Sequence, residues 1–188
     1  MTTATEKKIW TDSEFMALSG ENDRYELING ELVNMGNSGM EHGYLASNLT
    51  IFLGSYVLTH KLGVICDSST AFTMKTGNKR SPDISFVAKE RLQGMKRLPQ
   101  GSFSGAPDLV IEIISPNNTF AEFHGKMVEY FANECRLAWL IHADEQSVIV
   151  YRSPRPERLL KVTDNLDGEE VIPGFTMPTI DLFRDLDF

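Results

Sequence analysis

Apolar and polar positions along this chain follow two different periods. Over residues 42–58, and again over 120–133, apolar residues recur every three or four positions, which predicts two amphipathic helices. Thr11 and Glu14 have the spacing of a capping box ahead of a short apolar stretch. We therefore expect a brief first helix after Thr11.

Two β-hairpins are predicted, one toward each end of the chain. Asn29-Gly30 separates the β-like runs 24–28 and 31–35, and Asn-Gly between such runs is the strongest short-range hairpin signal. Residues 138–142 and 147–152 flank Asp144-Glu145-Gln146 and form the second expected hairpin.

The other strands are expected in the middle of the chain. Residues 63–74 and 84–87 are predicted strands, with a turn at Thr76-Gly77-Asn78 between them. Residues 107–115 form a nearly continuous β-branched run, closed by Pro116, which is typical of a central strand buried on both faces. Strands and helices alternate irregularly, so the pattern predicts an α/β or α+β domain around a mixed sheet.

The length of 188 residues fits one domain spanning 1–188, because domains usually run to roughly 100–200 residues. No apolar run approaches the ~18–20 residues of a membrane span. The polar residues 1–8 lead into no apolar signal-peptide core. Cys66 and Cys135 are the only cysteines, which excludes a disulfide framework and a Cys-rich zinc site. The expected location is a reducing cytoplasm, away from membranes.

The net charge of −8 argues against a protein that coats nucleic acid non-specifically. An enzyme acting on nucleic acid stays open, because active-site carboxylates add to the acidic count. Lys89, Arg91, Lys96 and Arg97 form a local basic stretch that is a candidate DNA contact. A solvated charged loop is the commoner explanation of such a run.

Glu112 is the sharpest anomaly, because it interrupts the apolar run of the predicted central strand. A carboxylate buried there without partners would be costly, so it must be paired, protonated or bound to a metal. The alternatives to a functional role are a salt bridge to a buried Arg or Lys, and an edge strand whose second face is wet.

A second carboxylate, Asp83, opens the strand 84–87, where a neighbouring strand could bring Glu112 alongside. Mg²⁺ is typically held by one or two carboxylates together with waters and phosphate oxygens. Asp108 is a rival partner that also follows a proline. It lies four residues from Glu112 on one strand, about 13 Å away at ~3.3 Å per residue, so the two cannot share an ion.

Lys126 lies in the predicted helix after the Glu112 strand, and the short loop between them lets it reach back over the strand end. An ammonium there can stabilise negative charge on a phosphate or orient an attacking water. An ordinary surface pair with Glu122, four residues earlier, is the alternative. Glu26 interrupts a β-like run and is a candidate oxygen ligand, or else a solvent-facing strand position. His42, as a lone histidine, is more often a cap or a structural hydrogen-bonder than a catalyst.

A set of short motifs runs over nearly the whole chain and is specific as a combination. In order they are Tyr25-Glu26-Leu27-Ile28, Gly30, His42, Pro82-Asp83, the run from Pro107 to Pro116, Lys126, Tyr130, Trp139-Leu140-Ile141 and Ile172-Pro173-Gly174-Phe175. In this combination they resemble the Uma-type family of putative restriction endonucleases, within the PD-(D/E)XK nuclease superfamily.

The resemblance implies a restriction-endonuclease-like mixed sheet flanked by helices, and metal-dependent hydrolysis of a DNA phosphodiester. It makes Asp83 the motif aspartate, Glu112 the acidic residue of the (D/E)-x-K element, and Glu26 an auxiliary acid near the metal. The position two after Glu112 is Ile114 instead of lysine. Lys126 matches the helix lysine of the family, which looks like a relocated catalytic lysine.

We therefore expect a DNA endonuclease whose Mg²⁺, replaceable by Mn²⁺, is held by Asp83, Glu112 and the carbonyl of Ile113. The metal would lower the pKa of bound water and neutralise the phosphate. Lys126 and Glu26 complete the expected catalytic set. Cutting both strands of a duplex needs two sites, so a homodimer is expected.

Two other functions fit the same residues. A nuclease-like fold without activity, serving as a binding or regulatory module, is favoured by the acidic charge and by the lack of the family's usual arginines after Pro116. The third function is metal-dependent hydrolysis of a small phosphoester.

Overall fold

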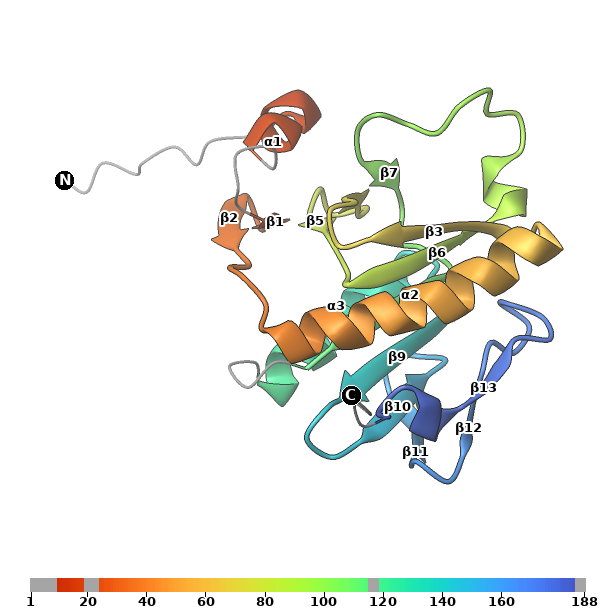
Figure 1. The fold of residues 1–188 in the computed structure, drawn as a ribbon. Coiled ribbons are helices and arrows are strands. Elements are labelled where there is room, and N and C mark those ends of the chain that lie inside the picture. Colours follow the sequence, from red (N-terminus) through yellow and green to blue (C-terminus); the bar gives the residue numbers. More distant parts are fainter. Residues whose placement is uncertain (1–9, 19–23, 115–118, 185–188) are drawn as a thin grey trace.

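The computed structural model describes residues 10–18, 24–114 and 119–184, and a six-stranded mixed sheet forms its centre (Figure 1). The strands lie in the order β11-β10-β9-β8-β6-β3. Their bounds are β3 Gly63–Asp67, β6 Ile84–Ala88, β8 Leu109–Ile113, β9 Leu137–His142, β10 Ser147–Tyr151 and β11 Pro156–Leu160. The predicted polar start at 1–8, together with Ser115, Pro116 and the last four residues, lies outside the described residues.

All neighbours in this sheet pair antiparallel except β8 and β9, which run parallel. Parallel neighbours need a crossover connection, and α3, Phe120–Ala132, supplies it. Thr119 caps α3: its hydroxyl accepts from the backbone N–H of Glu122 at 3.3 Å, and its own N–H donates to the Glu122 carboxylate at 2.7 Å. The crossover fixes where α3 begins relative to the end of β8.

The remaining strands form two smaller sheets. A five-stranded sheet has the order β2-β1-β5-β4-β7, and a hairpin joins β12 to β13. The bounds are β1 Tyr25–Ile28, β2 Glu31–Asn34, β4 Phe72–Thr73, β5 Lys79–Arg80, β7 Phe103–Ser104, β12 Asn165–Asp167 and β13 Thr176–Pro178. The helical elements besides α3 are α1 Asp12–Leu18, α2 Met40–His60, η1 Lys89–Leu92 and η2 Thr179–Asp181.

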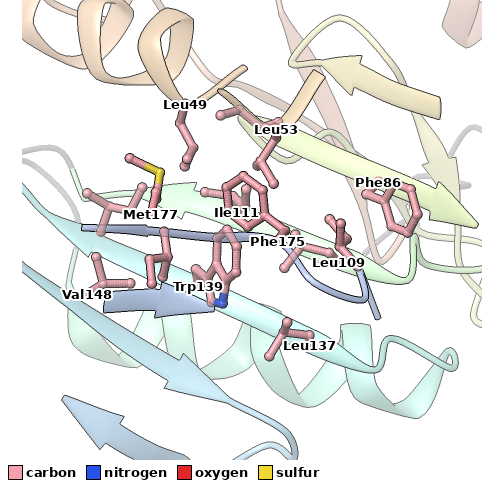
Figure 2. Packing of buried hydrophobic residues seen from close by; sticks show 14 of the residues in the cluster. Leu49, Leu53, Phe86, Leu109, Ile111, Leu137, Trp139, Val148, Phe175 and Met177 are labelled. Carbon is pink, nitrogen blue, oxygen red and sulfur yellow. The ribbon is translucent and has the colours of Figure 1, made fainter. Parts of the chain in front are cut away.

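The two long helices cover opposite faces of the central sheet. In Figure 1, α2 crosses in front of the strands and α3 lies behind them. Leu49 and Leu53 of α2 pack with Trp139 of β9 and with Phe175 from the C-terminal segment (Figure 2). Side chains of α3 form a separate apolar cluster on the other face. The predicted mixed sheet flanked by helices is confirmed.

Strand β8 serves both faces, because successive side chains of a strand point to opposite sides. Leu109, Ile111 and Ile113 belong to the α2 cluster, whereas Val110 belongs to the α3 cluster. All five residues of β8 are buried, as predicted for a central strand. Alternation puts Glu112 on the Val110 side, so its carboxylate faces α3.

Several local predictions are confirmed. Thr11 and Glu14 form the capping box, with N–H to oxygen distances of 3.0 and 3.2 Å. Asn29 and Gly30 have φ values of 52° and 81°, as a two-residue turn of positive φ requires, and they join β1 to β2. β9 and β10 form the second predicted hairpin. Within the described residues, no helix combines the length and apolarity needed to cross a bilayer.

The prediction of one continuous strand over 63–74 is wrong, because the strand is interrupted after Asp67. β3 ends at Asp67, whose carboxylate accepts hydrogen bonds from the N–H and hydroxyl of Ser69. A side chain that satisfies the backbone two residues later favours a turn over a ladder. The chain then starts again as β4 in the other sheet.

Candidate active site

Glu112, the anomaly of the central strand, is 3% exposed and is held by two side chains of α3. Lys126 Nζ lies 3.2 and 3.1 Å from its two carboxylate oxygens, and the Tyr130 hydroxyl donates to Oε1 at 2.8 Å. Lys126 and Tyr130 are four residues apart, so they project from the same helix face. The structure therefore confirms the prediction that Lys126 reaches back to the strand of Glu112.

Asp83 approaches from the neighbouring strand, one residue before β6. Ile84 pairs with Ile111, so the next positions on the two strands bring Asp83 to the level of Glu112. Its Oδ2 accepts from the backbone N–H of Ile113 at 2.9 Å and lies 3.0 Å from His42 Nε2. His42 therefore contributes to this site through Asp83.

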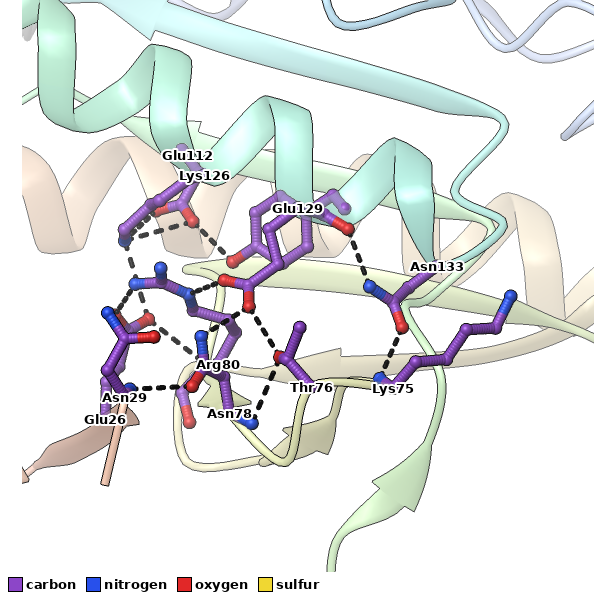
Figure 3. A network of polar contacts seen from close by, with 12 residues as sticks. Glu26, Asn29, Lys75, Thr76, Asn78, Arg80, Glu112, Lys126, Glu129 and Asn133 are labelled. Carbon is purple, nitrogen blue, oxygen red and sulfur yellow. Dashed lines mark hydrogen bonds and ion pairs between the residues drawn. The ribbon is translucent and has the colours of Figure 1, made fainter. Parts of the chain in front are cut away.

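Glu26 is the third acid of the site, and its predicted solvent-facing alternative is wrong. It is 1% exposed; Arg80 Nη1 donates to its Oε2 at 2.8 Å, and the N–H of Ser81 to its Oε1 at 3.2 Å. Lys126 Nζ lies 3.6 Å from Oε1. Lys126 thus sits between two carboxylates, Glu112 and Glu26 (Figure 3).

A polar network fixes this group to the five-stranded sheet. Arg80 Nε donates to Glu129 of α3 at 2.6 Å, while Glu129 also accepts from Asn78 at 2.6 Å and from Thr76 at 3.1 Å. Figure 3 shows these contacts running from α3 to the loop before β5. The network orients Arg80, which in turn orients Glu26.

Burial is the main reason that the pKa of Glu112 is raised to about 7. Asp83 and Glu26 add negative charge that favours the protonated form. Lys126 and Tyr130 oppose the rise, because both donate to the carboxylate. The site therefore contains one carboxyl group that changes charge near neutral pH.

Neighbouring charges also shift the pKa values of the other groups of the site. Burial alone would raise the pKa of Asp83, but the hydrogen bond and charge of His42 and the Ile113 N–H outweigh it and lower that pKa. The same bond to Asp83 raises the pKa of His42. For Lys126, burial is outweighed by Glu112 and Glu26, so its pKa rises. The ammonium stays protonated among the three carboxylates.

These residues surround a pocket of about 350 Å³. Its wall combines the loop 35–39 with residues from five parts of the fold: Arg24, His42, Asp83, Glu112, Ile113 and Lys126. Arg24 adds positive charge, since its Nη2 lies 3.6 Å from Asp83 Oδ1. Glu26 lies behind this wall, where it contacts Lys126.

Asp83 and Glu112 bring two carboxylates to one pocket, which Ile113 also lines. Mg²⁺ accepts such a set, because it keeps several waters and needs only one or two carboxylates. Across the described residues, no three Asp, Glu, His or Cys side chains gather to hold a metal ion. The donors therefore fit a partly hydrated hard cation and do not fit a closed zinc site.

Three participants were given no role in the site from the sequence. Arg24 lies two residues before Glu26, and that spacing places both side chains on one face of the strand. Tyr130 is one helical turn after Lys126, which is a recognisable signal. Arg80 meets Glu26 from 54 positions away, and no local pattern indicates that contact.

Two sequence candidates lie apart from this pocket. Asp108 is buried near the other end of β8, where its Oδ2 accepts from the N–H of Ala88 at 2.9 Å. Its separation from Glu112 agrees with the argument that the two acids cannot share an ion. The basic stretch after β6 begins near Asp108, because Arg91 Nη1 lies 3.5 Å from Asp108 Oδ2. Arg91 donates there to the carbonyls of Ala106 and Ser104, whereas Lys96 is exposed.

Comparison with known proteins found a matching family model and a similar solved structure. Residues 12–181 match the model of the Uma2 family, described as "Putative restriction endonuclease". The chain belongs to this family. No curated protein matches the Uma2 chain.

A solved structure also resembles the Uma2 chain: "a putative nuclease belonging to DUF820 from Anabaena variabilis ATCC 29413". It has a TM-score of 0.73 and 22% sequence identity, over 85% of this chain and 89% of that one. At that identity the likeness concerns the fold.

Proposed function

We propose that this Uma2 chain is a metal-dependent endonuclease that hydrolyses DNA phosphodiester bonds in the pocket beside Glu112. The observation that carries the proposal is the position of Lys126, whose Nζ lies within 3.2 Å of the Glu112 carboxylate. A lysine from α3 thereby reaches the acid that the sequence leaves without a lysine two positions later. Family membership supports the same chemistry.

Each residue has a task in this proposal. Asp83, Glu112 and the Ile113 carbonyl would hold Mg²⁺ or Mn²⁺, which supplies an activated water and neutralises phosphate charge. Lys126 stabilises the charge that develops on the phosphate. Glu26 acts through Lys126, because its carboxylate lies 3.6 Å from the ammonium.

We also propose that two copies of the chain act together. Each chain has one such pocket, and cutting both strands of a duplex requires two. A homodimer is the simplest assembly that provides them.

Metal binding tests the proposal before any substrate is known. We would titrate Mg²⁺ and Mn²⁺ into the wild type and Glu112→Gln, and record the heat of binding and the melting temperature. A ligand that binds only the folded state raises stability by mass action. Glu134→Gln is the matched control, since Glu134 is an exposed carboxylate paired with Lys75.

Saturable binding in the wild type and in Glu134→Gln, lost in Glu112→Gln, supports the metal site. Equal binding by all three proteins would refute the role of Glu112. Absence of binding in the wild type, with Glu112→Gln at least as stable, would favour the nuclease-like binding module. The second candidate rests on the ion pairs that already hold these acids, Glu112 with Lys126 and Glu26 with Arg80.

A further inference from the structure

A second pocket of about 500 Å³ adjoins the one beside Glu112. The two share Arg24, Ser38, His42 and Asp83, so they are parts of one groove that passes over Asp83. Beyond Asp83 the groove follows α2, where its wall includes Gly43, Ala46, Ser47, Thr50 and Ile51. The candidate active site is therefore one end of a longer depression.

The far part of the groove has small and hydroxyl side chains within a mainly apolar wall, and Asp67 is the carboxylate at its edge. Its α2 residues recur at spacings of three and four, so they line a single helix face. Ser47, Thr50 and Ser68 contribute hydroxyl groups there. Hydroxyls and small side chains suit a sugar–phosphate backbone, which needs close approach and many polar contacts.

Arg24 lies where the two pockets meet. Its side chain is 31% exposed, and its closest charged partner in the described structure is Asp83, at 3.6 Å. Its Nε is buried and has no hydrogen-bond partner among the residues that the structure describes. The exposed part of the guanidinium is well suited to a phosphate, because arginine binds phosphate oxygens through charge-assisted hydrogen bonds.

We propose that Arg24 binds a backbone phosphate of a nucleic-acid strand that continues from the candidate active site along α2. This inference rests on the proposed function and adds the size of its substrate. Because the groove continues past Asp83, the site takes a polymer with nucleotides beyond the cleaved phosphate. A small phosphoester would leave the α2 part of the groove empty.

Binding of a labelled 12-nucleotide single-stranded DNA of mixed sequence tests the groove without requiring cleavage. The fluorescence anisotropy of the labelled DNA would be measured in EDTA and in Ca²⁺. An unlabelled dinucleotide and an unlabelled 12-mer would be the competitors. The variants are Arg24→Gln, Arg24→Lys, Ser47→Glu and Ser55→Glu. Ser55 is exposed on the same helix but lies outside both pockets, so Ser55→Glu controls for the added charge.

Arg24→Gln is expected to weaken binding of the 12-mer about tenfold or more, as for loss of charge-assisted hydrogen bonds. The slope of log affinity against log salt should fall by about 0.7, the value for one phosphate contact on a single strand. Arg24→Lys should keep the salt slope and lose part of the affinity. Ser47→Glu should weaken binding several-fold, whereas Ser55→Glu should bind as the wild type does.

Two results would overturn the inference: a dinucleotide that competes as well as an unlabelled 12-mer, or Ser47→Glu binding as tightly as Ser55→Glu. Melting temperatures identify any variant that fails to fold. If Arg24→Gln fails to fold, the comparison of Ser47→Glu with Ser55→Glu tests the groove. The proposed function fails separately, through metal binding that survives in Glu112→Gln. If the 12-mer binds in the groove but the metal site is absent, the protein is a nucleic-acid-binding module and not a nuclease.

Discussion

The two ends of β8 carry two carboxylates that are equally buried and very differently held. Asp108 and Glu112 are each 3% exposed. Asp108 accepts from the main-chain N–H of Ala88 and lies 3.5 and 3.7 Å from Arg91 and Arg136. The donors of Glu112 are both side chains of α3, Lys126 and Tyr130.

The charge around each end separates them further. Two arginines face Asp108, so that carboxylate is fully compensated. Glu112 shares Lys126 with Glu26 and lies near Asp83, and Arg80 is committed to Glu26 and Glu129. An acid anchored by backbone and matched by cations stabilises a fold, whereas a surplus of acid beside a pocket attracts a cation.

Removing Lys126 should have the largest effect on this comparison. Lys126→Ala is expected to lower the rate of metal-dependent DNA cleavage about 10²- to 10³-fold, as for loss of one charge-stabilising group. Mn²⁺ binding should persist, because the proposed metal donors remain, but its pH midpoint should move upward, because Lys126 no longer lowers the pKa of Glu112. Lys75→Ala, which removes an exposed lysine, is the matched control. Cleavage by Lys126→Ala at the wild-type rate would show that its proposed role is wrong.

Asp108→Asn should affect stability and leave the chemistry unchanged. The amide can still accept from Ala88, but Arg91 and Arg136 lose their carboxylate. We expect a loss of about 1–3 kcal/mol in the free energy of unfolding, measured with denaturant. The Mn²⁺ affinity of Asp108→Asn should equal that of the wild type. A large fall in affinity would mean that the two ends of β8 are not separate in function.

Local patterns were enough to predict the elements that bear the site. The interrupted apolar run identified Glu112, the Asn-Gly dipeptide identified the hairpin of β1 and β2, and the short connection to α3 predicted the reach of Lys126. Each of these features is confined to a few neighbouring residues. Period and turn chemistry therefore report them directly.

The rest of the site depends on contacts between distant segments. Pro82-Asp83 and Pro107-Asp108 are the same dipeptide, and only the neighbouring strands make Asp83 part of the pocket and Asp108 a structural acid. The burial of Glu26 follows from Arg80, which arrives from another strand of the five-stranded sheet. Local propensity also missed the turn after Asp67, because the β-branched residues on both sides of the turn favour one longer strand.

Acidification should weaken metal binding at the Glu112 end. Metal binds the ionised carboxylate, and the pKa of Glu112 is about 7, so apparent affinity should fall about tenfold from pH 8 to pH 6. Without metal, acidification should instead stabilise the fold. The pKa of Glu112 in the folded protein lies above its ordinary value, so the contribution of Glu112 to stability is lost as pH rises toward and through 7. Melting curves across this range, with and without Mn²⁺, measure both effects. Glu134→Gln should behave as the wild type, and a metal response independent of pH would contradict the assignment.

The smallest expected change comes from Tyr130→Phe, which removes one hydrogen bond from Glu112. Burial raises the pKa of Tyr130 well above its ordinary value, so the hydroxyl remains a donor throughout the pH range. Its loss should raise the pKa of Glu112 further and lower Mn²⁺ affinity at pH 7 about two- to fivefold. Tyr151→Phe is the matched control, because the buried Tyr151 hydroxyl has no hydrogen-bond partner among the described residues. If the two variants show the same pH midpoint for the Mn²⁺ response, Tyr130 does not influence the pKa of Glu112.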